Sequence, residues 1–229
     1  MKELIPPEAT TGDRVHVLVR SLLSAAPYVG GAAVELFTAL ITPPLESRRQ
    51  EWMRDVGERL KELQDNKGIM VEDLSKNDKF IDVVLQVSHS AMRTSQEEKR
   101  NALLNAISNS ALNIEPDESM RQMFLDMIDS FNEWHLRILR LFQDPRKWAE
   151  INNPSFPSRS LGGLDDVLEN AYVAMKGKRT FYDQLWRDLH ARGLVSTDGL
   201  HSMMTAGGAL SQRTTELGDR FLRFIEKGF

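Results

Sequence analysis

The sequence contains no cysteine. This absence excludes disulfide bonds, thiolate metal sites and thiol nucleophiles, and it is typical of cytosolic proteins. The chain also lacks a strong excess of one charge, since its formal net charge is -4 over 229 residues. A chain with that balance is not, as a whole, a polyelectrolyte partner for nucleic acid. We therefore expect a cytoplasmic globular protein.

Long hydrophobic runs are missing as well. The most apolar region, residues 15–41, contains Arg20 and Glu35, which bound an uncharged run of about 14 residues where roughly 18 are needed to span a bilayer. The opening MKELIPPEATTGDR has prolines and acids where a secretion signal has an apolar core. We expect a soluble protein. An apolar surface that inserts into a membrane stays open as an alternative for this region, although Glu35 favours burial in a helical bundle.

Motifs for catalysis and for cofactors are absent too. No serine lies in a GxSxG elbow, and no P-loop or GxGxxG follows a predicted strand. The histidines show no HExxH or paired-ligand spacing, so we expect solvated or core side chains rather than metal ligands. These residues are His16, His89, His135, His190 and His201. The sequence therefore predicts a non-enzymatic protein without cofactor or metal.

Helical periodicity is what the sequence does contain. Apolar residues at spacings of three and four predict a helix around residues 15–22 and a second over 33–41. Pro43 and Pro44 predict that the second helix stops there and that a third begins at Leu45 and runs to about Gln64. Its apolar stripe consists of Trp52, Val56, Leu60 and Leu63. Further stripes follow over 80–91, 103–107 and 120–131, and Ser95 with Glu98 predicts a capping box.

One stretch interrupts the helices. Residues 152–163, NNPSFPSRSLGG, are dominated by Asn, Pro, Ser and Gly, which favour loops. We expect an exposed segment that is the preferred site of limited proteolysis. The sequence leaves open whether it is a linker between domains or a long loop within one.

The last part of the chain combines helices with signals for a small hairpin. Thr180 and Asp183 have capping spacing at the start of a helix that Gly193 should end in the left-handed conformation. The segments around Gly207-Gly208 predict a two-stranded hairpin between Leu194 and Thr215, although LHSMM also fits one helical turn. Thr214 or Thr215 then caps a closing helix, which buries Leu217, Phe221, Phe224 and Ile225.

These motifs carry a resemblance. The segment LWRDLHARGLV, a Gly-tipped hairpin and TTELGDRFL resemble the recognition helix, wing and final helix of bacterial winged-helix proteins such as MarR-type regulators. NEWHLRILRLF resembles the opening helix of that family, so the likeness covers roughly residues 132–225. A second likeness lies in AAPYVGGAAVELFTALITPPLESRRQEW, which resembles uncharacterised bacterial proteins related to the abortive-infection alpha group. It implies a helical region without active-site residues.

The expected fold is therefore mainly α, with a helical bundle over residues 1–131 and a winged-helix-like domain over 132–229 that contains the long loop 152–163. We expect a protein-interaction or regulatory scaffold, which binds a protein partner or a second copy of itself. A DNA-binding transcriptional regulator is the first alternative, and a membrane-acting phage-defence effector is the second. Fold alone does not decide between these functions.

The resemblance also assigns candidate nucleic-acid contacts. Residues 132–229 carry 14 Lys and Arg against 12 Asp and Glu, and residues 1–131 carry 15 against 21, so the basic excess is small. Phosphate contacts require a basic face. Asp183 and Asp188 on the candidate recognition helix should repel phosphates, so we expect weak binding to DNA. The candidate contacts are Lys176, Lys178, Arg179, Arg187, Arg192 and Arg213.

Overall fold

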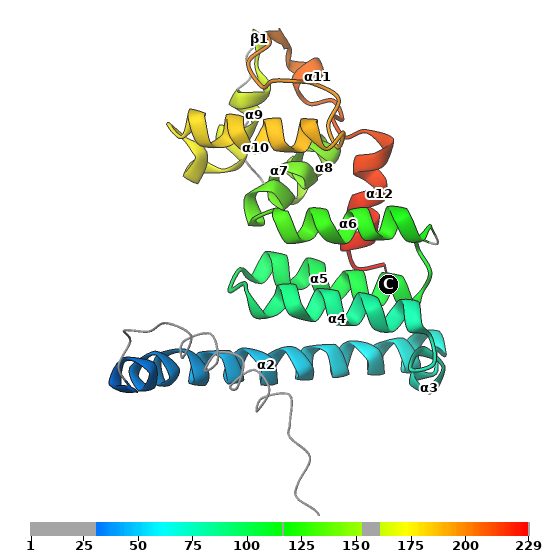
Figure 1. The fold of residues 1–229 in the computed structure, drawn as a ribbon. Helices are drawn as coiled ribbons and strands as arrows, with labels where there is room; N and C mark the ends of the chain where they lie inside the picture. Colours follow the sequence, from blue (N-terminus) through cyan, green and yellow to red (C-terminus); the bar gives the residue numbers. More distant parts are fainter. Residues whose placement is uncertain (1–30, 116, 153–160, 229) are drawn as a thin grey trace, which may run out of the picture. The chain divides into compact units, whose positions relative to one another are not determined.

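The computed structural model describes residues 31–115, 117–152 and 161–228, and α-helices form most of them (Figure 1). The expectation of a mainly helical protein is thereby confirmed. The elements are α2 (Gly31–Lys67), α3 (Val71–Leu74), α4 (Asp78–Met92), α5 (Glu97–Ala111), α6 (Glu118–Ser130), α7 (Glu133–Gln143), α8 (Pro145–Asn152), β1 (Leu161–Gly162), α9 (Leu164–Ala171), the 3-10 helix η1 (Val173–Met175), α10 (Arg179–Ala191), β2 (Met204–Thr205), α11 (Ala206–Ala209) and α12 (Glu216–Ile225). The predicted helix around residues 15–22 lies outside the described residues.

Contacts divide the chain into two compact units, residues 1–58 and 59–229. The first unit is described from Gly31 onward, as the larger part of α2. That helix continues through residues 43 and 44, so the predicted break at the two prolines is wrong. A proline inside a helix removes one N–H donor and costs about 3 kcal/mol, which weakens a long helix without forcing it to end. Of the predicted stripe, Trp52, Val56 and Leu63 are buried.

The second unit has its core around α5, which packs against α4 and against α12. Apolar residues of α5 and α12 that are fully buried meet there, including Ile107, Phe221 and Phe224. Phe124 of α6 lies with its ring centroid 5.5 Å from that of Phe221 and 5.6 Å from that of Phe224. Helices before and after residue 131 therefore share one core.

Two asparagines of α5 fix the end of α12. The Asn109 Nδ2 lies 3.0, 2.8 and 2.8 Å from the carbonyl oxygens of Arg223, Phe224 and Glu226. The Asn105 Nδ2 donates to the carbonyl of Ile225 at 3.0 Å. The last carbonyls of a helix have no partner within it, so these side chains satisfy groups that would otherwise be buried without a hydrogen bond.

A second group of helices packs on α7. The contacts of α7 with α9 and with α10 bury Leu139, Leu168 and Leu189 completely. The rings of Phe142 on α7 and Trp186 on α10 meet edge to face with centroids 4.9 Å apart. These contacts determine which face of α10 remains accessible to solvent.

The segment between Leu194 and Thr215 differs from the predicted hairpin. Its base is paired, because Val195 and Thr214 form an antiparallel bridge. Its tip is not a Gly-Gly turn, since α11 occupies residues 206–209 and β2 pairs with β1 of the predicted loop. Among the described glycines, Gly68, Gly177 and Gly193 have positive φ. Gly207 and Gly208 lack the positive φ that tight hairpin turns require, and the Thr205 hydroxyl accepts from the Gly208 N–H, which begins a helix instead.

Helix ends were predicted with mixed success. Gly193 has a φ of 71°, and Thr215 caps α12 by accepting from the Gly218 N–H at 3.0 Å, so both predictions are confirmed. The N-cap of α5 is Gln96 rather than Ser95. The N-cap of α10 is Lys178, so the predicted cap formed by Thr180 and Asp183 is wrong. Asp183 instead contacts His201. Residues 153–160 of the predicted loop lie outside the described residues.

Candidate functional site

The candidate site lies where α9, α10 and the segment 198–201 meet. The backbone N–H groups of Leu164 and Asp165, in the first turn of α9, donate to the carbonyl of Leu200 at 2.9 and 3.2 Å. First-turn donors of a helix have no internal acceptor, so the Leu200 carbonyl completes this helix end. A Cβ on Gly163 would lie 3.1 Å from the same carbonyl oxygen, which leaves little space for a larger residue. The segment is thereby held beside α9.

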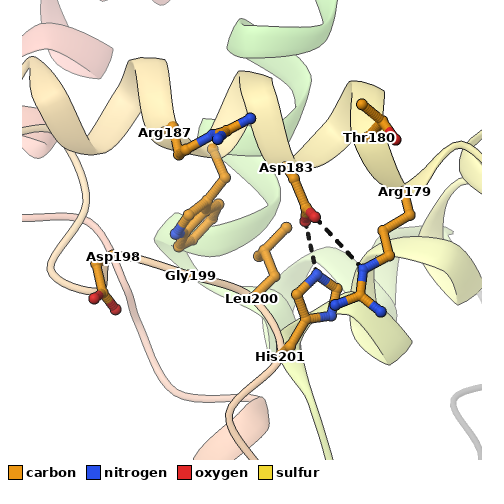
Figure 2. A pocket seen from close by; sticks show the side chains of 9 residues that line it. Arg179, Thr180, Asp183, Arg187, Asp198, Gly199, Leu200 and His201 are labelled. Atoms are coloured by element: carbon orange, nitrogen blue, oxygen red, sulfur yellow. Dashed lines mark hydrogen bonds and ion pairs between the residues drawn. The ribbon is translucent and has the colours of Figure 1, made fainter.

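His201 follows directly and bridges two aspartates. Its Nδ1 lies 2.8 Å from Oδ2 of Asp165 on α9, and its Nε2 lies 2.7 Å from Oδ1 of Asp183 on α10. Figure 2 shows Asp183 pointing from α10 toward His201 and also toward Arg179, whose Nε lies 3.6 Å from Oδ2 of Asp183. Both ring nitrogens face ionisable carboxyl oxygens, and an imidazole can donate from both nitrogens only when it is protonated. We call Asp165, Asp183 and His201 the aspartate–histidine bridge.

The electrostatics of the bridge favour the charged imidazole. Burial by itself lowers the pKa of His201, but the hydrogen bonds to Asp183 and Asp165 and their negative charges outweigh it, so the pKa lies above its ordinary value. Each of the three side chains is about 30% exposed, with values of 29%, 30% and 29% for His201, Asp165 and Asp183. Solvent therefore screens the interaction in part.

Tyr182 lies next to the aspartate–histidine bridge. Its hydroxyl donates to Oε1 of Glu169 on α9 at 3.1 Å, and its ring centroid lies 6.1 Å from that of His201. Burial and the hydrogen bond to Glu169 raise the pKa of Tyr182 to about 12. Tyr182 therefore stays a neutral donor near pH 7, and it provides a second link between α9 and α10.

An open pocket of about 310 Å³ lies beside the bridge (Figure 2). Trp186 and Leu200 are buried members of its wall, whereas Arg187 is an exposed one. The complete lining is Arg179, Thr180, Asp183, Trp186, Arg187, Asp198, Gly199, Leu200 and His201. Both nitrogens of His201 are engaged by carboxylates, so its ring holds elements together rather than offering a free base.

The six predicted cations do not form one surface. Arg179 and Arg187 line the same pocket. Arg192 contacts Ser130 of α6 at 3.5 Å, and Arg213 donates to the carbonyl of Gly208 at 2.5 Å and contacts the sulfur of Met204. Arg213 is half-buried, and its guanidinium already contacts residues 204–208. The remaining two, Lys176 and Lys178, are exposed.

The two aspartates that were expected to repel phosphates both have partners. Asp183 belongs to the bridge, and Asp188 accepts from Nε2 of Gln184 at 2.7 Å and lies 3.3 Å from Nε2 of His135. The charge of Asp183 is thereby partly compensated by His201 and Arg179, whereas Asp188 has hydrogen-bond partners without a matching charge. No sequence pattern links His201 to Asp165 or to Asp183, because these residues lie 36 and 18 positions away from it.

Residues 31–115, 117–152 and 161–228 contain no group of three or more His, Asp or Glu side chains placed to hold a metal ion. No helix formed by them is both long enough and apolar enough to cross a membrane. Comparison of the chain with protein-family models, curated proteins and solved structures found no match in any of the three.

Proposed function

We propose that this protein is a non-catalytic regulatory scaffold built on a winged-helix-like module, and that it acts by binding another protein molecule. The order of elements supports the proposal: α7, β1, α9 and α10 are followed by the segment 194–215 and then by α12. β1 pairs with β2 of that segment, and Val195 pairs with Thr214. A winged helix has the same order of an opening helix, a helix-turn-helix, a wing and a final helix.

The observation that carries the proposal is the division of α10 into two faces. Tyr182, Leu185, Trp186 and Leu189 are buried, whereas the opposite face, with Thr180, Gln184 and Arg187, is exposed. A helix that is anchored on one side and open on the other offers a preformed contact surface.

The composition near α10 favours a protein partner. Exposed apolar side chains occur in and before its first turn, because Val173 is 71% and Phe181 is 41% exposed. Aromatic and apolar residues are enriched at the centres of protein interfaces. The predicted cations are dispersed, because Arg179 and Arg187 line the pocket, whereas Arg192 contacts Ser130 and Arg213 donates to the carbonyl of Gly208. A second copy of the chain is the first partner to test.

The test is sedimentation equilibrium over about 1 to 200 µM, a range that covers typical weak dimers. We expect the wild type to self-associate and the double variant Val173→Ser/Phe181→Ser to sediment as a monomer. Leu85→Ser is the matched control, since Leu85 is a similarly exposed apolar residue on α4 at 64% exposure. A wild type that stays monomeric throughout, or equal association of all three proteins, would contradict the proposal.

Sequence-specific DNA binding is the second candidate. One observation favours it: the exposed face of α10 presents Thr180, Gln184 and Arg187, which are residue types that contact base edges. We expect binding to mixed genomic DNA at about 150 mM salt to stay weaker than about micromolar, because few cations are available for phosphates. Fluorescence anisotropy measures this. Tight, salt-dependent binding that Arg187→Ala abolishes would instead make the protein a DNA-binding regulator.

A membrane-acting defence effector is the third candidate. It depends on the apolar residues 15–41, of which 31–41 lie in α2. Within that part, Phe37 is 39% and Leu40 is 73% exposed. Leakage of a dye from liposomes after addition of the protein would support this candidate, and unchanged dye retention would remove it.

A further inference from the structure

The aspartate–histidine bridge requires a protonated imidazole. Its two carboxylates come from different helices, and each lies within 2.8 Å of one ring nitrogen of His201. A neutral ring has one N–H group and one lone pair. If the ring loses a proton, one of the two carboxylates faces that lone pair at hydrogen-bonding distance, which is repulsive. The arrangement is therefore stable in one protonation state.

The backbone determines which half of the bridge opens. The carbonyl of Leu200 accepts from both Leu164 and Asp165, so the residue next to His201 stays attached to α9 whatever the charge of the ring. Earlier in the segment, the Trp186 indole donates to the carbonyl of Thr197 at 2.8 Å. After His201, by contrast, Ser202 and Met203 are both exposed, Met203 to 71%. On the α10 side, the ring itself contacts Asp183.

We propose that His201 is a pH-sensitive latch, which ties residues 201–203 to the first turns of α10 when protonated and releases Asp183 when it loses a proton. The Asp165 half of the bridge stays closed. The released Asp183 keeps Arg179 as its partner at 3.6 Å. The surface of α10 beside the pocket then loses one positive charge and gains a carboxylate that no longer has an imidazolium partner. This inference does not depend on the proposed function.

The charges around the ring support this response. Two carboxylates contact it directly and stabilise the imidazolium, and together they outweigh the burial that disfavours it. The titratable groups in contact with His201 are Asp165 of α9 and Tyr182 and Asp183 of α10. The lining of the adjoining pocket adds three charged groups, which are Arg179, Arg187 and Asp198.

The raised pKa of His201 makes the bridge more stable in acidic than in alkaline solution. The pKa of His201 in the folded protein lies above that of an unfolded histidine, which is about 6.5. The bridge therefore contributes its full stability below pH 6.5 and loses it as the pH rises through the folded pKa. Closure is expected in mildly acidic solution, and opening on the alkaline side.

The experiment is an NMR titration of the full chain with hydrogen exchange at the same pH values. We expect the His201 ring to titrate above pH 6.5, and Asp183→Asn and Asp165→Asn each to lower its midpoint. The amide resonances of residues 201–203 should shift with the same midpoint, and their heteronuclear NOE values should fall as the pH rises through it, because the contact with Asp183 is lost. The amides of Leu164 and Asp165 should stay protected, because their bonds to Leu200 remain.

Variants separate the latch from a purely structural role. His201→Gln should give low heteronuclear NOE values at 201–203 at every pH, and His201→Lys, which keeps a positive charge, should suppress the pH dependence of these values. His190→Gln is the matched control, because His190 is an exposed histidine of α10 outside the bridge. A His201 midpoint at or below 6.5 would overturn the proposal. So would heteronuclear NOE values at 201–203 that are unchanged across the midpoint, or loss of exchange protection at Leu164 and Asp165 above it.

Discussion

At the scale of single residues, Lys99 is a cation buried in the core of the larger unit. It is 9% exposed and donates to the carbonyls of Asp129 and Phe131 at 2.6 and 2.9 Å. Burial lowers its pKa, although the charge of Asp129 counteracts this. Both acceptors lie at the C-terminal end of α6, where a positive charge is favourable for the helix dipole. The Lys99 ammonium therefore supplies the donors that the next turn of α6 would provide if the helix continued.

Lys99→Met tests this role. The variant keeps the apolar stem but leaves two carbonyls without the donor, so we expect the free energy of unfolding to fall by about 2–3 kcal/mol. Urea denaturation measures the change. Lys79→Met is the control, because Lys79 is an exposed lysine that pairs with Glu118 on the surface, and a much smaller effect is expected there. Equal effects of the two substitutions would refute the assigned role of Lys99.

His135 should respond to pH in the opposite direction from His201. Burial lowers its pKa even though Asp188 acts against the shift. Its Nδ1 accepts from the backbone N–H of Asn132 at 3.1 Å, which a doubly protonated ring cannot do. Because the folded pKa lies below the unfolded value of about 6.5, stability falls as the pH drops below 6.5 toward the folded pKa.

Unfolding free energies measured from pH 5 to pH 8 check this sign. We expect His135→Gln to flatten the acidic side of the profile and His201→Gln to flatten the alkaline side. A His135→Gln profile that still falls as steeply as the wild type below pH 6.5 would show that another group causes the acid sensitivity.

At the scale of elements, periodicity and local chemistry predicted what depends on neighbours in sequence. Of the predicted buried face of α12, Phe221, Phe224 and Ile225 are buried and Leu217 is half-buried, and the Thr215 cap was predicted correctly, because both features are defined within a few residues. The break at residues 43–44 and the Gly207-Gly208 turn were wrong, since local preference is weak compared with the rest of a helix and with pairing to β1. The partners of Asp183 come from other elements, so no local pattern indicated them.

The close approach of α12 to residue 194 provides an element-level prediction. A Cβ on Gly218 would lie 2.3 Å from the carbonyl oxygen of Leu194, which is a backbone atom and cannot rotate away. We expect Gly218→Ala to lower the free energy of unfolding by about 2–3 kcal/mol, because α12 must shift. Gly57→Ala is the matched control in a helix with open space, and it should stabilise by about 0.5–1 kcal/mol. Thermal unfolding followed by circular dichroism compares them, and a neutral Gly218→Ala would contradict the packing.

At the scale of the whole molecule, the helical content was predicted from the sequence, whereas the contacts between helices far apart in the chain were not. The domain boundary at residue 131 stays a prediction. On either side of it, α5 and α12 pack against each other within the compact unit 59–229. Glu115 and Arg220 add an ion pair of 2.9 Å between the same two regions. Contacts between positions more than 100 residues apart leave no mark in local periodicity, so the sequence could not reveal them.

Cooperative unfolding of residues 59–229 is the corresponding prediction. We expect Asn109→Ala, which removes the α12 end contacts, to reduce hydrogen-exchange protection of α5 and of α10 together. Exchange measured by mass spectrometry in increasing urea distinguishes the cases. Retained protection of α10 while α5 opens would instead support separate domains before and after residue 131.

The asparagines of α5 also have a consequence for synthesis on the ribosome. Asn105 precedes its partner carbonyl at Ile225 by 120 residues. At about 5–20 residues per second, roughly 6–24 s pass between translation of the first and the last member of this pair. During that time α12 does not cover the apolar face of α5, and the side chains of Asn105 and Asn109 lack their partner carbonyls. A nascent chain stalled before residue 216 should therefore bind holdase chaperones at α5, and release should coincide with emergence of α12 from the exit tunnel.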